Sequence, residues 1–282
     1  MPPRAPITLQ AAADRLGVHY MTAYRYVRTG RLPATRDGVE WRVDPADVDR
    51  LRAANRSPAK RGSRGKAMER LEQRMLAGDV AGAWSVVESA LVSGATPPEI
   101  HLELLAPALR SIGRRWADGE ITVADEHRAS VTAQRIIGQL GPRFARRGRT
   151  RGTVVIGAPA GELHSLPSAI LADLLRHARF RVVDLGANTP AESFVDAARG
   201  AERLVAVCIG VTNGGFDDVV AATLGTLRDA EVGAPVFVGG AAIVDEEHAR
   251  RLGADGWSGA DAASVIAAVE AAVEGSVSGP GR

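Results

Sequence analysis

The chain has 282 residues, of which 45% are hydrophobic and 24% are charged. This length allows more than one core, and the absence of any run of about 18 apolar residues excludes a membrane protein. The single cysteine, Cys208, excludes disulfides and a cysteine-rich metal site. Because the first residues lack the layout of an export signal, we expect a cytoplasmic protein.

Charge is divided unevenly along the chain. Residues 1–66 contain 14 Lys and Arg against 6 Asp and Glu, a surplus of +8, whereas the remainder carries −6. A basic head on an acidic body indicates a polyanionic partner for the head alone. Nucleic acid is one interpretation, and a merely solvated basic face is the other.

The basic head has the layout of a helix-turn-helix. Thr8 can cap a helix that ends near residue 16, and a second helix over residues 20–29 ends at Gly30. A short hairpin over residues 35–43 follows, and then a third helix. We expect four side chains of the second helix to point outward: Tyr20, Tyr24, Arg25 and Arg28.

The run from Leu16 to Ala34, with Trp41-Arg42-Val43, resembles the excisionase-like branch of MerR-type DNA-binding domains. The resemblance implies a winged helix-turn-helix over residues 1–54 that binds a double-stranded DNA operator. The candidates for base contact are Tyr24 and Arg25, and those for backbone contact are Arg28, Arg36 and Arg42. One small head makes few phosphate contacts, so a homo-oligomer, a dimer or a tetramer, is expected. A helical protein-interaction module is the alternative.

Residues 55–66 lack apolar periodicity and predict a flexible basic linker. Residues 67–148 then show helical spacing of apolar side chains, which predicts a four-helix bundle. Asp118-Gly119 interrupts it, and Thr122 can start the next helix with a capping box. Taken alone, Trp116 before this break fits a core aromatic, and Glu126-His127 after it fit solvated residues of a first helical turn.

Residues 152–275 alternate strand-like apolar runs with helical segments, which predicts an α/β, doubly wound parallel sheet of Rossmann-like type. Ligands of such sheets bind beyond the carboxyl ends of the strands. Glu162-Leu-His164 follows the first run, Thr212 the third, and Gly239-Gly240 the fourth. An imidazole is a good cobalt ligand, and a carboxylate two residues earlier can orient it. A nucleotide-binding sheet is the competing interpretation, but no G-x-G-x-x-G follows the first run.

Glu162-x-His164 resembles the Asp/Glu-x-His-x-x-Gly signature of cobalamin-binding domains, although Pro167 replaces its last glycine. The resemblance implies that His164 is the lower axial ligand of cobalt and that the cofactor's nucleotide tail enters a groove in the sheet. Thr212 matches the second hydroxyl position of the motif, and Gly239 and Gly240 match the glycine pair that lets the backbone approach the tail.

Trp116 followed by Glu126-His127, directly before such a domain, looks like the cap of CarH/LitR-type cobalamin-dependent photoreceptor regulators. This implies that Trp116 covers the upper face of the cofactor over its adenosyl group, with Glu126 and His127 close to it. Light-responsive members have a histidine after this tryptophan, which ligates cobalt after illumination. Ala117 stands there in this chain, so either light sensing works differently or the signal is something else.

These resemblances imply a transcriptional regulator, not an enzyme, that binds cobalamin, senses adenosylcobalamin and responds to light through the cobalt–carbon bond. Two alternatives remain. The first is a corrinoid carrier of a methyl-transfer system, against which the basic head argues. The second is a regulator of the same architecture that senses another ligand, an alternative raised by Ala117 and Pro167.

Overall fold

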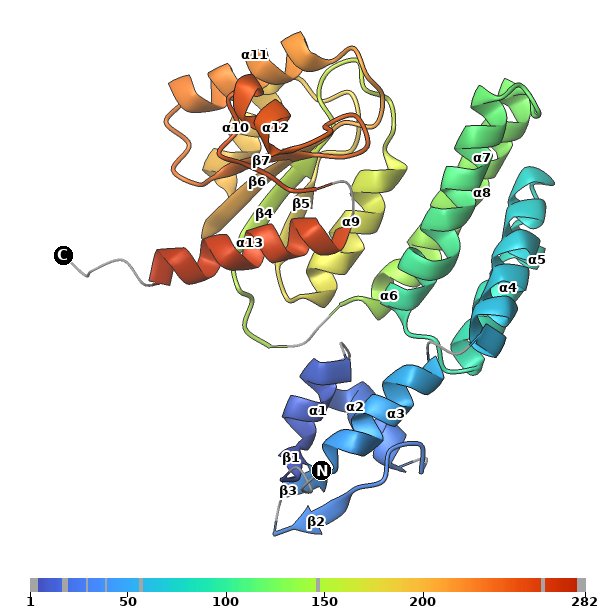
Figure 1. Ribbon diagram of the computed structural model, residues 1–282. Coiled ribbons are helices and arrows are strands. Elements are labelled where there is room, and N and C mark those ends of the chain that lie inside the picture. Colours follow the sequence, from blue (N-terminus) through green and yellow to red (C-terminus); the bar gives the residue numbers. More distant parts are fainter. Residues whose placement is uncertain are drawn as a thin grey trace. The chain divides into compact units, whose positions relative to one another are not determined.

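The computed structural model describes residues 5–16, 20–28, 30–38, 40–55, 58–145, 148–259 and 262–277, with the side chains of 21, 22, 25, 52–61, 63, 263 and 274–277 left aside. The chain divides near residue 67 into two compact units (Figure 1). Within the described ranges, no helix is long and apolar enough to cross a membrane.

The first unit contains three helices and a small antiparallel sheet of strand order β1-β3-β2. Its elements are β1 (Ile7–Thr8), α1 (Leu9–Leu16), α2 (Tyr20–Arg28), β2 (Thr35–Asp37), β3 (Glu40–Val43) and α3 (Pro45–Asn55). The hydroxyl of Thr8 accepts a hydrogen bond from Ala11 N–H at 3.2 Å. Gly30 follows α2 with φ +70°, a conformation that glycine adopts readily. The helices and hairpin lie where the sequence predicts them, while the turn at residues 17–19 lies outside the described residues.

Where residues 55–66 are described, they are helical and differ from the predicted flexible linker, because Asn55 ends α3 and residues 58–66 are the first turns of α4 (Pro58–Leu76). Proline is tolerated in a first turn, and Lys, Arg and Ala are good helix formers. Leu71 and Met75, further along the same helix, are fully buried. Packing of the second half therefore holds a helix whose first half has no apolar stripe.

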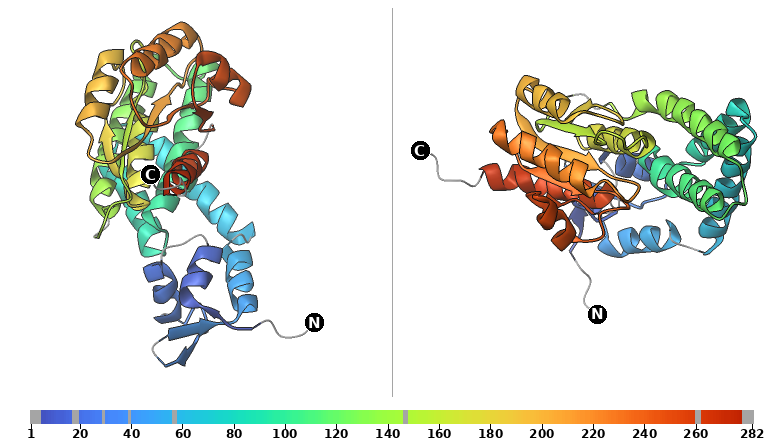
Figure 2. Two further views of the ribbon diagram at one scale, coloured as in Figure 1. Left: turned by 90° about the vertical axis from the view of Figure 1, so that its left-hand side faces the viewer. Right: turned by 90° about the horizontal axis from the view of Figure 1, so that it is seen from above.

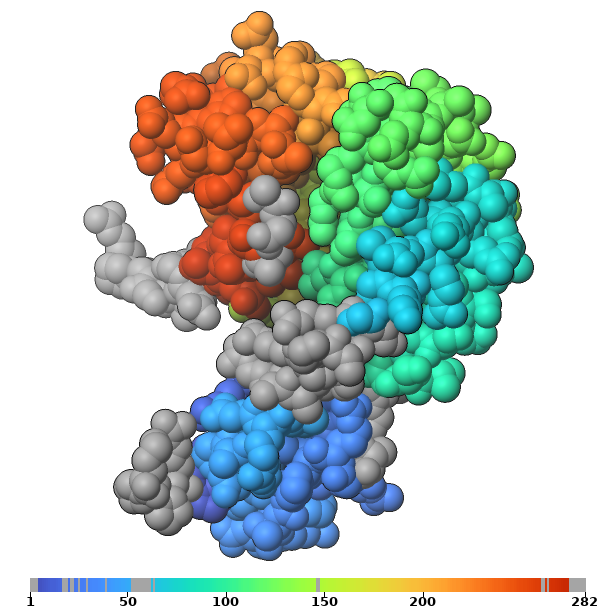
Figure 3. Space-filling view, turned by 45° about the vertical axis from the view of Figure 1, so that its right-hand side comes forward, coloured from blue at the N-terminus to red at the C-terminus, as the bar shows by residue number. Residues whose placement is uncertain are grey.

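The second unit begins with a helical cap. Its elements are α4, α5 (Val80–Val92), α6 (Pro97–Ile100), the π-helical turn η1 (His101–Leu105), α7 (Ala106–Ala117), α8 (Val123–Leu140) and the short 3-10 turn η2 (Gly141–Arg143). Since α6, η1 and α7 follow one another without a gap, they form one helical stretch, and the cap has the four helical stretches of a bundle. In Figure 3 the cap is coloured cyan to green and lies beside the sheet domain in orange and red.

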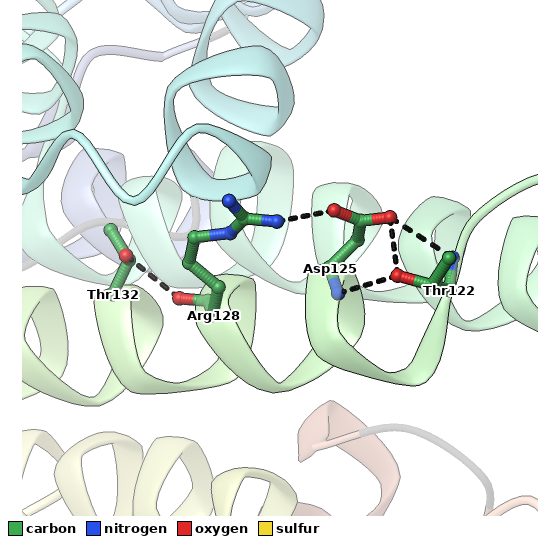
Figure 4. Close-up of polar contacts among 4 residues, drawn as sticks. All are labelled: Thr122, Asp125, Arg128 and Thr132. Atoms are coloured by element: carbon green, nitrogen blue, oxygen red, sulfur yellow. Dashed lines mark hydrogen bonds and ion pairs between the residues drawn. The ribbon is translucent and has the colours of Figure 1, made fainter.

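The predicted capping box starts α8 (Figure 4). The Thr122 hydroxyl accepts from Asp125 N–H at 3.2 Å, and the Asp125 carboxylate accepts from Thr122 N–H at 3.0 Å. Asp125 also pairs with Arg128, and the Thr132 hydroxyl donates to the Arg128 carbonyl at 2.9 Å. The hydrogen bonds from Thr122 lower the pKa of Asp125. The turn after Trp116 is therefore closed by an ordered helix start.

The rest of the second unit is a five-stranded parallel sheet of order β5-β4-β6-β7-β8. The strands are β4 (Thr153–Gly157), β5 (Arg181–Asp184), β6 (Leu204–Gly210), β7 (Val236–Gly239) and β8 (Gly256–Trp257). The helices are α9 (Leu166–His177), α10 (Ala191–Gly200), α11 (Asp217–Asp229), α12 (Glu246–Leu252) and α13 (Ala262–Val277). The strand order reverses between β4 and β6, and α/β sheets bind ligands beside that point.

Helices cover both faces of this sheet (Figure 2). Helices α9 and α13 pack on one face, and α10, α11 and α12 lie on the other. Side chains alternate along β4: Val154 and Ile156 join the core under α9 and α13, and Val155 joins the opposite core. Cys208 is buried in the first of these cores, and burial raises the pKa of its thiol to about 12. It is a packed, protonated side chain.

Candidate cofactor site

The site is built where two neighbouring parallel strands end. The loop after β4 contains Glu162 and His164, and the loop after β6 contains Thr212 and Asn213. Because β4 and β6 pair directly, with Gly157 opposite Ile209, the two loops meet at one edge of the sheet.

Glu162 joins the two loops. Only 1% of it is exposed, and its carboxylate accepts four hydrogen bonds. One oxygen, Oε1, accepts from the N–H of His164 at 3.0 Å and lies 2.6 Å from Nδ1 of the His164 ring. The other, Oε2, accepts from the N–H groups of Thr212 at 2.8 Å and Asn213 at 3.0 Å. Burial favours the neutral carboxyl, but these bonds outweigh it and lower the pKa of Glu162.

The ionised Glu162 fixes the tautomer of His164. A carboxylate can only accept, so the ring proton sits on Nδ1 and donates to Glu162. Nε2 is then left with its lone pair free to bind a metal, and 44% of the His164 side chain is exposed. The pair therefore presents one oriented imidazole nitrogen at the edge of the sheet.

Sequence reasoning missed a second support for this loop. The Asn188 side-chain oxygen accepts from Gly161 N–H at 2.8 Å, and Asn188 N–H donates to the Glu162 carbonyl at 2.8 Å. Asn188 has φ +53°, a left-handed conformation that asparagine tolerates better than most residues. An asparagine in the turn after β5 was the available signal. The described contact of Thr212 is made by its backbone N–H, and the role of its hydroxyl toward the cofactor stays a prediction.

Gly239 and Gly240 lie at the end of β7, where the protein's own backbone passes close to them. A Cβ on Gly239 would come within 2.3 Å of Ser258 Oγ, and one on Gly240 within 2.3 Å of the Val211 carbonyl oxygen. Gly240 also has φ +102°. Glycine is therefore required here by the packing of three neighbouring strand ends.

The cap residues singled out in the sequence flank one turn. Trp116 is in the last turn of α7 and is 45% exposed, and Glu126 and His127 are in the first turns of α8. Glu126 accepts from the Ser130 hydroxyl at 2.6 Å and lies 2.6 Å from Nδ1 of His127. Burial opposes ionisation, but these bonds outweigh it and lower the pKa of Glu126. The first turns of α8 therefore present a carboxylate close to the Trp116 turn.

In the first unit, the predicted DNA-contacting residues differ in their surroundings. Tyr24 is half-buried, not fully outward, with its ring 6.5 Å from both the Tyr20 and Trp41 rings. Arg42 pairs with the wing's own carboxylates, Glu40 at 3.0 Å and Asp37 at 3.6 Å. Arg28 and Arg36 are exposed, and the Arg36 guanidinium lies over the Trp41 ring at 5.9 Å. The side chain of Arg25 lies outside the described residues.

Three family models match the chain in succession. A helix-turn-helix domain matches residues 7–56, and two B12 binding domain models match residues 67–140 and 152–268. The chain combines a helix-turn-helix domain with a two-part B12-binding module. The parts of this module are the helical cap and the parallel sheet.

Curated relatives of the module fall into two groups. Trimethylamine corrinoid protein 1 of Methanosarcina acetivorans is 28% identical over 195 residues, covering 66% of this chain and 89% of the relative. The HTH-type transcriptional repressor CarH of Myxococcus xanthus is 37% identical over 160 residues, covering 54% of this chain and 50% of that protein. The solved monomethylamine corrinoid protein of Methanosarcina barkeri has a TM-score of 0.64 at 18% identity, over 73% of this chain and 99% of that one, which shows a shared fold.

The side chains of the B12-binding module fit a cobalt corrinoid. His164 offers one imidazole nitrogen, Nε2, and no cluster of three or more potential metal ligands occurs in the described part of the chain. That donor set suits a metal whose remaining ligands come from a macrocycle. Large apolar side chains also stand exposed, with Leu163 beside His164 at 73% and Trp116 at 45%. Such uncovered apolar surface is typical of a site for a bulky ligand.

Proposed function

We propose that this chain is a cytoplasmic DNA-binding transcriptional regulator, not an enzyme, that binds cobalamin, with adenosylcobalamin as the preferred form. The observation that carries the proposal is the oriented Nε2 of His164, in a chain that also contains a helix-turn-helix domain. The relative named as a transcriptional repressor supports this combination.

In this proposal, Nε2 of His164 would ligate cobalt, and Glu162 would keep the His164 ring in place by accepting a hydrogen bond from Nδ1–H. When bound, adenosylcobalamin would supply a cobalt–carbon bond that light can break. Trp116, Glu126 and His127 would contact its adenosyl group, so the position of the cap would depend on whether that group is present.

On the DNA side, two or more heads of a homodimer or homotetramer bind one double-stranded operator together. One head makes few contacts, so a change in assembly changes affinity strongly. The exposed Arg28 and Arg36 are the best-placed phosphate ligands, because Arg42 is already paired with two carboxylates of its own hairpin.

Titration of the protein with adenosylcobalamin in the dark tests the cofactor. We expect the absorption spectrum of imidazole-ligated cobalt, and we expect His164→Ala to abolish it. His248→Gln is the matched control, because His248 lies in α12 of the same domain and pairs there with Asp217. A wild-type protein that stays colourless in excess cofactor refutes the proposal.

The DNA-binding part of the proposal is tested by selection from random double-stranded DNA, followed by fluorescence anisotropy with the enriched duplex. We expect binding that depends on cofactor and on Arg28, with sizing of the protein before and after green light to detect a change of assembly. Failure to enrich any sequence, with or without cofactor, contradicts a regulator.

The second candidate is a corrinoid carrier of a methyl-transfer system. The alignment with the trimethylamine corrinoid protein, which covers 89% of that relative, favours it. Methyl transfer from protein-bound methylcobalamin to a thiol acceptor, measured in the same preparation as DNA binding, separates the two. A regulator that senses another ligand is indicated if DNA binds but no cobalamin does.

A further inference from the structure

Cap and sheet are joined inside the second unit by a cluster of four side chains, which we call the joint: the buried His101, Phe144 and Asp173 and the half-buried His177. His101 belongs to η1, Phe144 follows η2, and the other two belong to α9. Nε2 of His101 lies 3.0 Å from Oδ2 of Asp173. The His101 ring stacks on Phe144 at 4.7 Å, and Phe144 meets His177 edge-on at 6.0 Å.

Stability does not explain the polar pair at the centre of the joint. His101 is completely buried and Asp173 is 3% exposed. Nδ1 of His101 has no hydrogen-bond partner among the described residues, while Oδ1 of Asp173 accepts from Arg176 at 3.1 Å. A buried ionisable pair generally adds less stability than apolar side chains of the same volume. What such a pair adds is directional: its atoms fit together in one relative position.

Each residue of the pair lies on a helical segment that connects to the candidate cofactor site. Asp173 lies two turns into α9, the helix that follows the His164 loop. His101 is the first residue of η1, which continues into α7, and the last turn of α7 contains Trp116. Its π-helical turn also departs from the regular helix, and such turns are frequent at functional positions. The pair therefore ties the helix after the lower ligand to the helix of the upper aromatic.

We propose that the His101–Asp173 pair is a positioning device that sets the spacing between Trp116 and His164, and through it the size of the upper cobalamin group that the site accepts. The inference rests on the proposed cobalamin binding. Without the pair, apolar contacts at the joint still hold cap and sheet together, but they permit more than one relative position.

The test uses the double variant His101→Leu with Asp173→Leu, which retains apolar volume and removes the polar pair. Dissociation constants for adenosylcobalamin and methylcobalamin are measured in the dark. We expect imidazole ligation by His164 to persist in the spectrum, while the preference for adenosylcobalamin over methylcobalamin falls about tenfold, a usual size for coupling between sites.

A second His–Asp pair provides a matched control. His248 in α12 and Asp217 in α11 are also joined Nε2 to Oδ2 at 3.0 Å, but within the sheet domain. His248→Leu with Asp217→Leu should leave the preference unchanged.

A distance measurement on the cofactor-free protein complements the dissociation constants. Spin labels at Val131→Cys on α8 and Val244→Cys after β7, both exposed positions, report the distance between cap and sheet. The buried Cys208 should not label. We expect the distance distribution to broaden in the joint variant and to stay narrow in the control variant.

Three outcomes are decisive. The inference is wrong if the preference for adenosylcobalamin is unchanged, whether both dissociation constants rise by the same factor or neither changes, and the distance distribution stays narrow. The pair is then merely structural. If the double variant does not fold, the isosteric Asp173→Asn takes its place under the same criteria. If wild-type protein binds neither cobalamin, the proposed function fails and this inference fails with it.

Discussion

Glu162 is the side chain on which the orientation of His164 depends. Glu162→Gln replaces the Oε1 acceptor or the Oε2 acceptor by an N–H₂ group, which cannot accept from the ring or from the two backbone N–H groups. Loss of such a supporting partner typically costs 10–100-fold in metal affinity. We expect a loss of about that size for adenosylcobalamin by titration, and no change for Glu192→Gln on the surface of α10. Unchanged affinity for Glu162→Gln contradicts the orienting role.

The lowered pKa of Glu162 also predicts how stability depends on pH. An unfolded glutamate titrates near ~4.3. The stabilisation from the ionised form is therefore complete above that pH and is lost as the pH falls through the lower folded-state pKa. Urea unfolding of wild type and Glu162→Gln from pH 7 to pH 3 should show a difference that shrinks toward acid. The comparison isolates Glu162 from Asp79, Asp125 and Glu126, whose pKa values are also lowered.

Some residues of the site can be predicted from the sequence and others cannot, because only some of them are neighbours in the chain. Glu162 and His164 are two residues apart, so a local motif predicts both. The N–H groups of Thr212 and Asn213 are about fifty residues away, and a backbone donor has no residue type to mark it. The same holds for His101 and Asp173, 72 residues apart, which no local pattern brings together.

At the scale of elements, periodicity predicts well wherever packing and local chemistry agree. The parallel sheet after residue 152, the two helices of the head and the Thr122 capping box all lie where the sequence places them. Sequence periodicity does not predict the first turns of α4, because they have no apolar stripe. The sequence cannot show that the buried Leu71 and Met75 stabilise a helix that extends back to Pro58.

Helix α4 makes a direct prediction. Gly62 and Gly65 lie inside it, and a Cβ at either position meets nothing within 4 Å. Replacing a glycine in a helix by alanine stabilises it by about 0.5–1 kcal/mol. Gly62→Ala and Gly65→Ala should therefore each increase helicity by circular dichroism and delay unfolding in urea. No gain in helicity contradicts a helix at residues 58–66.

Helix α2 and the hairpin meet through Tyr24. Its ring contacts Tyr20 and Trp41, and aromatic pairs contribute about 0.5–1.5 kcal/mol each. Tyr24→Ala removes both contacts and should weaken DNA binding about tenfold by anisotropy, because the hairpin loses its fixed position. Tyr24→Phe keeps both rings in contact and should bind normally. Equal losses for both variants would instead assign the Tyr24 hydroxyl to the DNA.

For the whole molecule, the question is how an event at cobalt in the proposed function would reach the helix-turn-helix head. Two ion pairs of the cap lie beside Trp116. Arg115, next to Trp116, donates to the largely buried Glu72 of α4 at 2.7 Å and to Glu120 at 3.2 Å. In the proposed regulator, a movement of the Trp116 turn would act on α4 through this ion pair. Helix α4 begins at Pro58, just after the helix-turn-helix match ends at residue 56, so we expect it to carry the signal toward the head.

If light removes the adenosyl group as in the proposed function, Ala117 bears on which ligands of cobalt remain. It is the exposed last residue of α7, beside Trp116, and its methyl group cannot ligate cobalt. Once light removes the adenosyl group, wild-type protein should therefore retain only the His164 imidazole. Ala117→His supplies a second imidazole and should convert the illuminated spectrum to that of two imidazole ligands.

Two measurements check this prediction. Gel filtration after illumination should show more cofactor retained by Ala117→His than by wild type, because cobalt is then held from both sides. Asp118→His is the matched control, because it places the new imidazole one residue further along the chain, at the C-terminal end of α7. It should not give the spectrum of two imidazole ligands. If illuminated wild-type protein already has a two-imidazole spectrum, a histidine such as His127 reaches the metal, and the substitution at position 117 does not decide the response to light.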